Sequence, residues 1–304
     1  MDLFIIGNGF DSGHRLKTAY GNFRDFLEET DSAFLRDLES LYGLSEDCNP
    51  EYAKDYLWAQ FEKQLPEIEE DFFVENAASL YLGLEEESGF GETLDSYYGN
   101  SFNFIEKLND YVLEWVEQID INTDKKTDKI VENTFDLFLT FNYTLVLEEV
   151  YGIRNQNILH IHGTVDGSNY FPIMGHGDTN KLDETKKNVI ESEREFDEKR
   201  NSIYKAIENY YKNTFKNVEE IMAKNQDFFK RMNAVRYVYV VGHSFGDVDM
   251  PYFEAVKNNT KENVIWNVYY FKDCEHDIFK KKVLSLGVKE ENLYMIRTYE
   301  FYNI

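Results

Sequence analysis

Short runs of apolar residues recur along the chain, and most of them are continuous rather than alternating with polar residues. Continuous runs are typical of strands that are covered on both faces, as in parallel sheets. The runs lie at residues 3–6, 135–141, 158–161, 237–241 and 264–271, with a weaker sixth at 293–296. Helical patterns separate most of them. This alternation predicts an α/β fold with a doubly wound, mainly parallel sheet.

Two long stretches interrupt the alternation and predict large helical insertions. Residues 31–130 carry helical patterns at about 51–73, with a break or kink at Pro66, and at 102–119. Residues 181–233 are highly charged and also have helical spacing. We therefore expect an α/β core formed by residues 1–30 and 131–304, with a charged helical insertion at about 181–233. Residues 31–130 are expected to form a second helical insertion or a subdomain.

The net negative charge indicates which classes of partner the chain is not expected to bind. The 304 residues carry 57 acidic and 32 basic side chains, for a net charge of −25. Such a surface repels nucleic-acid backbones and anionic lipid, so we expect neither nucleic acid nor membrane as a partner. An anionic small molecule would have to be held by local dipoles.

The cysteine content and the apolar runs indicate a cytoplasmic protein. Two cysteines, Cys48 and Cys274, make neither a disulfide framework nor a four-cysteine zinc site. No apolar run approaches the length that spans a bilayer. The first residues lack the basic region of a signal peptide.

Three polar motifs follow directly after predicted strands. They are Gly7-Asn8-Gly9-Phe10-Asp11, Phe141-Asn142-Tyr143-Thr144 and Gly242-His243-Ser244-Phe245-Gly246-Asp247. Ligands of open parallel sheets bind beyond the carboxyl ends of the strands, where loops lead into helices. The three motifs therefore predict one shared cleft, and its expected guest is a nucleotide.

The first motif supplies two residues without a Cβ atom, Gly7 and Gly9, which permits a tight turn or close approach of a phosphate or ribose. It is not a full GxGxxG fingerprint, because Ser12 stands at the third glycine position. A plain turn explains it equally well. Asp11 is interpreted as a helix cap or as a contact to a ligand hydroxyl.

Asn142 and His162 are the candidate catalytic residues. The Asn142 amide offers a donor and an acceptor, which suit a ribose hydroxyl and a water, although asparagine also serves turns. His162 precedes Gly163 and is a natural general base, with a core histidine as the alternative. His160 lies two residues earlier, but no third ligand stands out, so no metal site is expected. We expect Asn142 and His162 to lie within one side-chain reach.

The third motif has two functional interpretations. Gly242 and Ser244 suit a phosphate or ribose contact, while Asp249 further along suits a ligand contact or a helix cap. The same residues match the Gly-x-Ser-x-Gly nucleophile elbow literally, which would make Ser244 the nucleophile of a serine hydrolase. That alternative needs a downstream histidine, and only His276 follows.

With these motifs, the chain resembles the bacteriophage abortive-infection AbiH family. The resemblance includes His160-Ile161-His162-Gly163 and the segment from Gly242 to Tyr252-Phe253, in the family's order. More distantly, the motif order is similar to sirtuin-like, Rossmann-like NAD-binding domains. Asn8, Asp11 and Thr144 depart from that pattern, and the zinc-binding cysteine pairs of sirtuin deacylases are absent, which disfavours protein deacylation.

The resemblance implies an antiviral defence protein that harms or arrests the infected cell, and NAD cleavage is the chemistry that fits this role. NAD would be the substrate of a glycohydrolase with Asn142 and His162 as catalytic residues. The expected nucleotide-binding residues are Gly7, Asn8, Gly9, Phe10, Asp11, Gly242, His243, Ser244 and Asp249. The alternatives are a sensor or scaffold that binds an adenine nucleotide without cleaving it, and the Ser244 hydrolase. Expected partners are the nucleotide and either a second copy of the chain or a phage-derived or defence-system protein as trigger.

Overall fold

The chain divides into two compact units, and each is described by itself. The computed structural model describes residues 1–70, 104–132, 135–168 and 170–302. The first unit comprises Met1–Ala19, Leu113–Ile173 and Asn217–Ile304, and the second comprises Tyr20–Val112 and Met174–Lys216. The parts of the expected helices at residues 71–73 and 102–103 lie outside the described residues.

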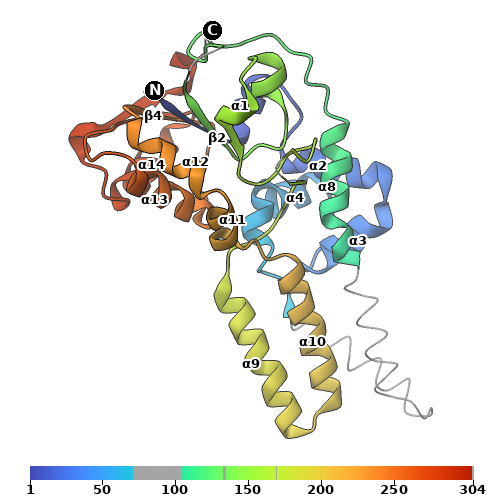
Figure 1. The fold of residues 1–304 in the computed structure, drawn as a ribbon. Coiled ribbons are helices and arrows are strands. Elements are labelled where there is room, and N and C mark those ends of the chain that lie inside the picture. Colours follow the sequence, from blue (N-terminus) through green and yellow to red (C-terminus); the bar gives the residue numbers. More distant parts are fainter. Residues whose placement is uncertain (71–103, 133–134, 169, 303–304) are drawn as a thin grey trace. The chain divides into compact units, whose positions relative to one another are not determined.

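The first unit is built on a six-stranded sheet, which confirms the predicted α/β fold (Figure 1). Every strand pairing is parallel, and the spatial order is β3-β2-β1-β4-β5-β6. The strands are β1 (Leu3–Ile6), β2 (Leu137–Thr140), β3 (Ile158–His160), β4 (Tyr237–Val241), β5 (Ile265–Tyr270) and β6 (Leu293–Arg297). The weak sixth apolar run is therefore a strand, whereas Phe135 lies outside β2.

The four strands β3, β2, β1 and β4 end in one row. Ile6 is in register with Thr140 on one side and Val241 on the other, and Thr140 is in register with His160. The loops that carry the three polar motifs therefore leave the sheet at the same edge. In this strand order the winding reverses between β1 and β4, and a ligand crevice forms at such a switch point in doubly wound sheets.

Two apolar layers cover the sheet because successive side chains of a strand point to opposite faces. Leu3 and Ile5 pack on the face covered by α11 (Val218–Lys224), α12 (Gln226–Lys230), α13 (Met250–Asn259) and α14 (Asp273–Ser285). Phe4 and Ile6 pack on the other face, with α1 (Asn8–Gly13) and the π-helical turn η3 (Val146–Val150). Figure 1 shows α1 on the side of the sheet away from α13 and α14. The short 3-10 turns of this unit are η4 (Asn155–Asn157), η5 (Arg231–Ala234), η6 (Asp247–Asp249), η7 (Glu290–Asn292) and η8 (Thr298–Glu300).

The described part of the second unit is helical, as the patterns of residues 31–130 and 181–233 predicted. Its elements are α2 (Tyr20–Thr30), α3 (Ser32–Ser40), α4 (Pro50–Tyr56), η1 (Trp58–Gln60), α5 (Phe61–Gln64), η2 (Phe104–Lys107), α9 (Thr179–Glu195) and α10 (Glu198–Asn213). Helix α8 (Leu108–Glu117) begins here and ends in the first unit. The helical pattern expected from residue 51, with a break or kink at Pro66, forms three short segments over residues 50–64. The last of them ends two residues before Pro66, because proline cannot continue the hydrogen-bond ladder.

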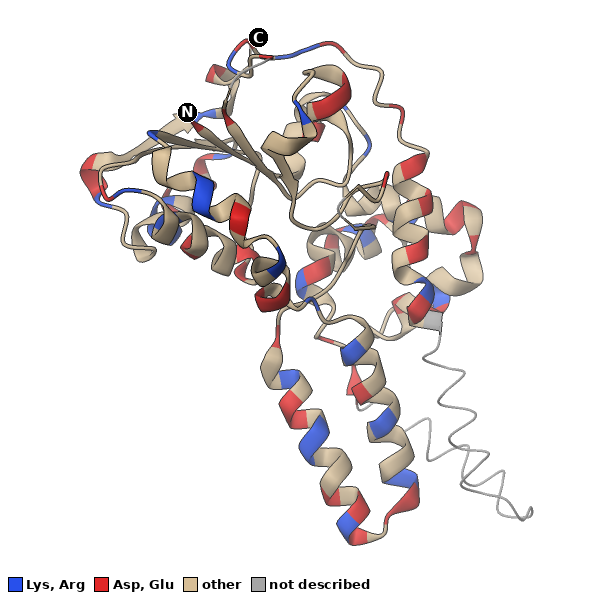
Figure 2. Ribbon diagram, in the orientation of Figure 1, with Lys and Arg blue, Asp and Glu red and all other residues tan. Residues whose placement is uncertain are grey.

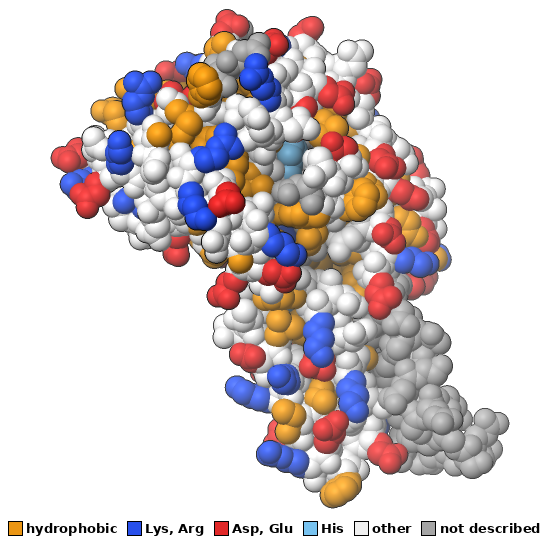
Figure 3. All heavy atoms as spheres, viewed as in Figure 1, with side chains coloured by type: hydrophobic (Ala, Val, Ile, Leu, Met, Phe, Trp, Pro, Cys, Tyr) orange, Lys and Arg blue, Asp and Glu red, His pale blue; other side chains and the backbone are white. Residues whose placement is uncertain are grey.

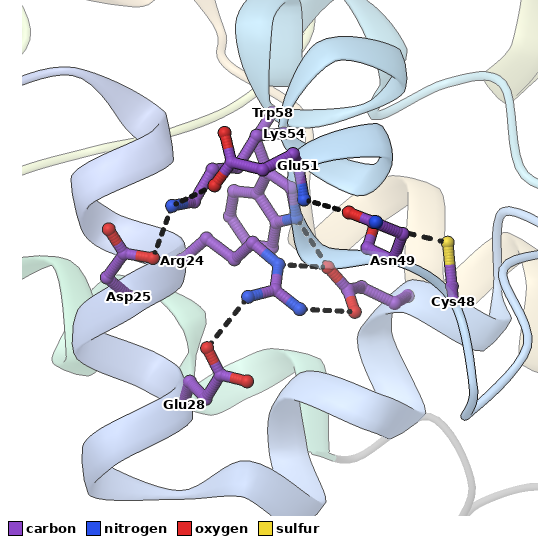
Figure 4. Close-up of polar contacts among 9 residues, drawn as sticks. Arg24, Asp25, Glu28, Cys48, Asn49, Glu51, Lys54 and Trp58 are labelled. Atoms are coloured by element: carbon purple, nitrogen blue, oxygen red, sulfur yellow. Dashed lines mark hydrogen bonds and ion pairs between the residues drawn. The ribbon is translucent and has the colours of Figure 1, made fainter.

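A buried ion pair joins α2 to α3 in the second unit (Figure 4). Arg24 Nε donates to Glu39 Oε1 over 2.8 Å, and the same oxygen accepts from the indole of Trp58 over 2.8 Å. The outer guanidinium nitrogen of Arg24 donates to Glu28 over 2.9 Å. Because both Arg24 and Glu39 are buried, these hydrogen bonds offset the cost of removing two charges from water.

Helices α9 and α10 pack against each other as a charged hairpin. Basic and acidic residues are interspersed along both helices (Figure 2), and ion pairs such as Lys205–Glu193 (3.3 Å) join them. The turn between them places Phe196 in the left-handed region with its side chain 91% exposed. A hydrophobic side chain is visible at the tip of this hairpin (Figure 3). None of the described helices is long and apolar enough to cross a membrane.

Candidate functional site

The loops after β1 and β4 touch through their glycines. Gly9 N–H donates to the Gly242 carbonyl over 2.8 Å. A Cβ atom on Gly242, whose φ is +66°, would lie 2.3 Å from the backbone nitrogen of Phe10, and one on Gly7 would lie 2.6 Å from the Gly242 oxygen. Both distances are far below van der Waals contact, so any side chain at these positions would separate the loops. The glycines therefore allow one loop backbone to rest on the other.

The backbone donors of the first loop are partnered within the protein. Gly7 N–H donates to Val241 O (3.0 Å), and Phe10 N–H donates to Gly7 O (2.9 Å). The Gly7 and Gly9 N–H groups donate to Val241 and Gly242, and so they join the first loop to the end of β4. Asn8 and Ser244 are exposed, so their side chains are the polar groups that these two loops offer to a ligand. Phosphate binding at this edge stays a prediction.

Asp11 is a buried carboxylate beneath the loops. Its Oδ1 accepts from Asn142 Nδ2 (2.9 Å), and its Oδ2 accepts from the Thr144 hydroxyl (2.6 Å). Burial raises the pKa of Asp11 to about 6, and the two hydrogen bonds only partly oppose that rise. Asp11 was expected to cap a helix or contact a ligand, whereas its carboxylate holds the residues after β2 in place.

Asn142 is oriented by this carboxylate. Its Nδ2 donates both to Asp11 and, over 3.2 Å, to the Gly7 carbonyl, which assigns the amide nitrogen and oxygen unambiguously because both partners only accept. Within the described residues no hydrogen bond reaches Asn142 Oδ1. The side chain was expected to use both a donor and an acceptor on the ligand. With the donor committed inside the protein, the acceptor Oδ1 is the group left for a hydroxyl or a water.

His160 supports the other side of Asn142. Its Nδ1 lies 2.8 Å from the Asn142 carbonyl, which can only accept, so Nδ1 carries a proton. Its Nε2 faces Glu148 Oε1 over 2.8 Å. Strand β3 ends at His160, so the strand alternation of side chains between opposite faces does not extend to His162. The two imidazoles face different carboxylates.

Asp249 lies between the other two histidines. Its Oδ1 is 3.2 Å from His162 Nε2, and its Oδ2 is 3.3 Å from His243 Nε2. The first contact has an ion-pair distance without hydrogen-bond geometry, so the buried Oδ1 has no hydrogen-bond partner among the described residues. Burial alone would raise the pKa of Asp249, but His162 and His243 outweigh it and hold that pKa well below its usual range.

A backbone hydrogen bond sets the tautomer of His243. Phe245 N–H donates to His243 Nδ1 over 2.8 Å, so Nδ1 bears the lone pair and Nε2 carries the proton that faces Asp249. Asp249 thus keeps a negative charge between two imidazoles. The sequence predicted that His243 and Asp249 contact a nucleotide. In the structure these two side chains contact each other.

Aromatic rings enclose the His162 imidazole, which is only 3% exposed. The rings of Phe141 and Tyr252 meet it edge-on, with centroids 5.1 and 6.0 Å away. The ring is therefore buried, as in the core-histidine alternative, but its Nε2 faces a carboxylate. A carboxylate beside one nitrogen of an imidazole is a feature that this contact shares with acid–histidine pairs.

Ser244 lacks the base that a nucleophile needs. It is exposed, and in the described part of the chain no hydrogen bond joins it to a histidine. His276 lies on α14 and contacts the neighbouring Asp277 over 2.8 Å. The nucleophile-elbow interpretation therefore has no supporting geometry.

Three supporting residues were not singled out as site residues from the sequence. Thr144 donates to Asp11, and Glu148 contacts His160. Lys282 donates to the Phe245 carbonyl in the loop after β4. Thr144 and Glu148 follow Asn142 closely, and polar residues so near a strand end were an available signal. Lys282 is 35 positions beyond the loop, and no local pattern marks it.

The fold and this edge define a doubly wound, Rossmann-like α/β protein with a polar site at the switch point of its parallel sheet. The chain belongs to the family described as "Bacteriophage abortive infection AbiH", whose profile matches residues 3–270. No curated protein and no solved structure gives a significant match.

Proposed function

We propose that this abortive-infection protein hydrolyses the nicotinamide–ribose bond of NAD, with Asn142 and His162 as its catalytic residues. The observation that carries the proposal is that a buried carboxylate contacts each of these two side chains. Asp11 accepts from the Asn142 amide nitrogen, which leaves Oδ1 as the acceptor, and Asp249 Oδ1 lies 3.2 Å from His162 Nε2. Asn142 follows β2 and His162 follows β3, and these neighbouring strands end in one row. Cytoplasmic location and NAD as the substrate are parts of the proposal.

The reaction needs little from the protein beyond orientation and one base. The bond between ribose C1′ and the nicotinamide nitrogen breaks, and its electron pair leaves with a neutral nicotinamide. A water oxygen bonds to C1′ and loses one proton. In the proposal, Asn142 Oδ1 accepts from a ribose hydroxyl or from this water, and His162 takes the proton. Because the leaving group is neutral, no strong acid is required.

The first experiment measures nicotinamide released from NAD by the purified full chain, with and without lysate of phage-infected cells in case a trigger is required. Asn142→Ala and His162→Gln are expected to lower turnover by about 10²–10⁴. Glutamine keeps an N–H that can face Asp249 but cannot act as a base. His276→Gln, an exposed histidine on α14, is the matched control and should retain full turnover.

The decisive result is nicotinamide release that depends on His162. Protection of cells against phage at constant NAD concentration, together with no release in either assay condition, would end the proposal. Release that survives both substitutions would place the chemistry elsewhere in the chain.

Binding of an adenine nucleotide without cleavage is the second candidate. It is favoured by the 3% exposure of His162, since a buried imidazole has little access to the water and ribose of a bound nucleotide. Calorimetry with ADP-ribose and NAD distinguishes the two functions. Tight binding of both compounds with no nicotinamide release supports a sensor or scaffold.

A further inference from the structure

We propose that Lys282 is a positioning residue for His162 and acts on it through Phe245, His243 and Asp249. This inference rests on the proposed function, because it assigns His162 a role in the reaction. Lys282 lies on α14, outside the three polar motifs. All five residues belong to the first unit.

Lys282 anchors the loop that carries His243 and Asp249. Its Nζ donates to the Phe245 carbonyl over 3.0 Å and forms an ion pair with Asp247. The Lys282 side chain is 29% exposed and that of Asp247 is 85% exposed, so their ion pair by itself contributes little to stability. The contact with the carbonyl is different, because it fixes the orientation of a peptide inside the site.

Phe245 has a backbone conformation that needs such an anchor. Its φ is +56°, in the left-handed region that residues with a Cβ atom disfavour. The ring is buried against Phe253 and against Phe279 of α14, with centroids 4.7 and 5.1 Å away. Helix α14 thus holds both the ring and the carbonyl of Phe245.

This conformation directs the Phe245 N–H to His243. The N–H occupies Nδ1, so His243 carries its proton on Nε2 and presents it to Asp249 Oδ2. The opposite tautomer would turn a lone pair toward the carboxylate and repel it. Asp249 Oδ1 is the oxygen that faces His162, so a displaced Asp249 changes its contact with the His162 imidazole.

The test compares Lys282→Met with Lys282→Arg and Lys280→Met. Arginine keeps a donor for the Phe245 carbonyl. Lys280 is the matched control, because it lies on the same helix and pairs with a surface carboxylate, Glu290, over 2.6 Å. The first readout is the ring ¹⁵N resonances of His243, which report the tautomer without any turnover. The second is kcat and KM for nicotinamide release.

We expect His243 to be an Nε2–H tautomer in wild type, in Lys282→Arg and in Lys280→Met, and a mixture in Lys282→Met. In the same variant kcat should fall on the order of tenfold with KM nearly unchanged, as loss of a residue that orients an imidazole does. Where Lys282→Met does not fold, Asp247→Asn removes the surface partner of Lys282 and should shift the tautomer less but in the same direction.

An unchanged His243 tautomer in folded Lys282→Met overturns the inference. The same holds if Lys280→Met shifts the tautomer equally, because the effect would then be a general loss of α14 structure. A wild-type protein that releases no nicotinamide contradicts the proposed function instead, and the NMR result still decides whether Lys282 sets the His243 tautomer.

Discussion

Asn142 donates a hydrogen bond to Asp11 over 2.9 Å, although 131 positions separate the two residues in the chain. They meet because β1 and β2 are neighbours and both motifs follow the last paired residues of these strands. Burying a carboxylate this deeply costs free energy. In return, Asp11 holds the Asn142 amide and the Thr144 hydroxyl in a single orientation.

The first prediction is that Asp11 makes stability fall as pH rises. Its pKa is about 6 in the folded protein and 3.8 is its ordinary value. Between these values the folded chain binds more protons than the unfolded chain, so the free energy of unfolding declines with pH. The expected decline is about 2 kcal/mol from pH 4 to pH 7, because one pKa unit is worth roughly 1.4 kcal/mol and part of the effect lies below pH 4.

Urea unfolding of wild type and Asp11→Asn at several pH values between 4 and 7 checks this. Other carboxyl groups also titrate, so the relevant quantity is the difference in the free energy of unfolding between the two proteins. With rising pH, the variant should become more stable relative to wild type. A difference that stays constant with pH would show that Asp11 is not a buried, raised-pKa group.

The second prediction concerns the contact between the loops. Gly242→Ala should destabilise the protein by about 3 kcal/mol or more, since a Cβ atom would meet Phe10 nitrogen at 2.3 Å in addition to the positive φ. Gly287→Ala is the matched control, with φ +83° and nothing within 4 Å of its Cβ. It should cost only the backbone strain, about 1–2 kcal/mol. Equal losses in denaturant unfolding would disprove steric exclusion at Gly242.

The third prediction concerns the ion pair of the second unit. Arg24→Met should cost about 3–5 kcal/mol, because it leaves the buried Glu39 charge without its cation. Adding Glu39→Gln should recover part of that loss, since glutamine is uncharged and still accepts from Trp58. Lys54→Met, which breaks an ion pair with the half-exposed Asp25, should cost at most about 1 kcal/mol. A double variant as unstable as Arg24→Met alone would contradict the charge explanation.

The fourth prediction is a stabilising change at the hairpin tip. Phe196→Gly should raise the free energy of unfolding by about 0.5–1 kcal/mol, because φ is +55° and the exposed ring contributes no packing. Phe245→Gly should instead destabilise the protein, although its φ is nearly the same, because the ring is buried among other aromatic rings. Thermal unfolding of both variants measures this, and opposite signs are the expected outcome.

The sequence by itself determined the sheet and the positions of its loops. Apolar runs identified the six strands of the described sheet. Most runs are continuous because these strands are covered on both faces, and the run at 293–296 is weaker because β6 is only partly buried. The helical character of the insertions also followed from spacing. Asn142 and His162 could be placed at strand ends for the same reason, because strand ends are local features of the chain.

Only the tertiary structure decided what these residues contact. The glycines of the first and third motifs suggested room for a phosphate, yet the nearest neighbour of each loop is the backbone of the other loop. Asp11 and Asp249 suggested ligand contacts, and each is engaged by side chains from other motifs. Lys282 had no signal in the sequence, because its partner carbonyl is 37 positions away. Hydrophobic periodicity is set by neighbours in the chain, whereas the pairing of buried polar groups depends on which strands lie side by side, and that is decided only when the whole sheet has formed.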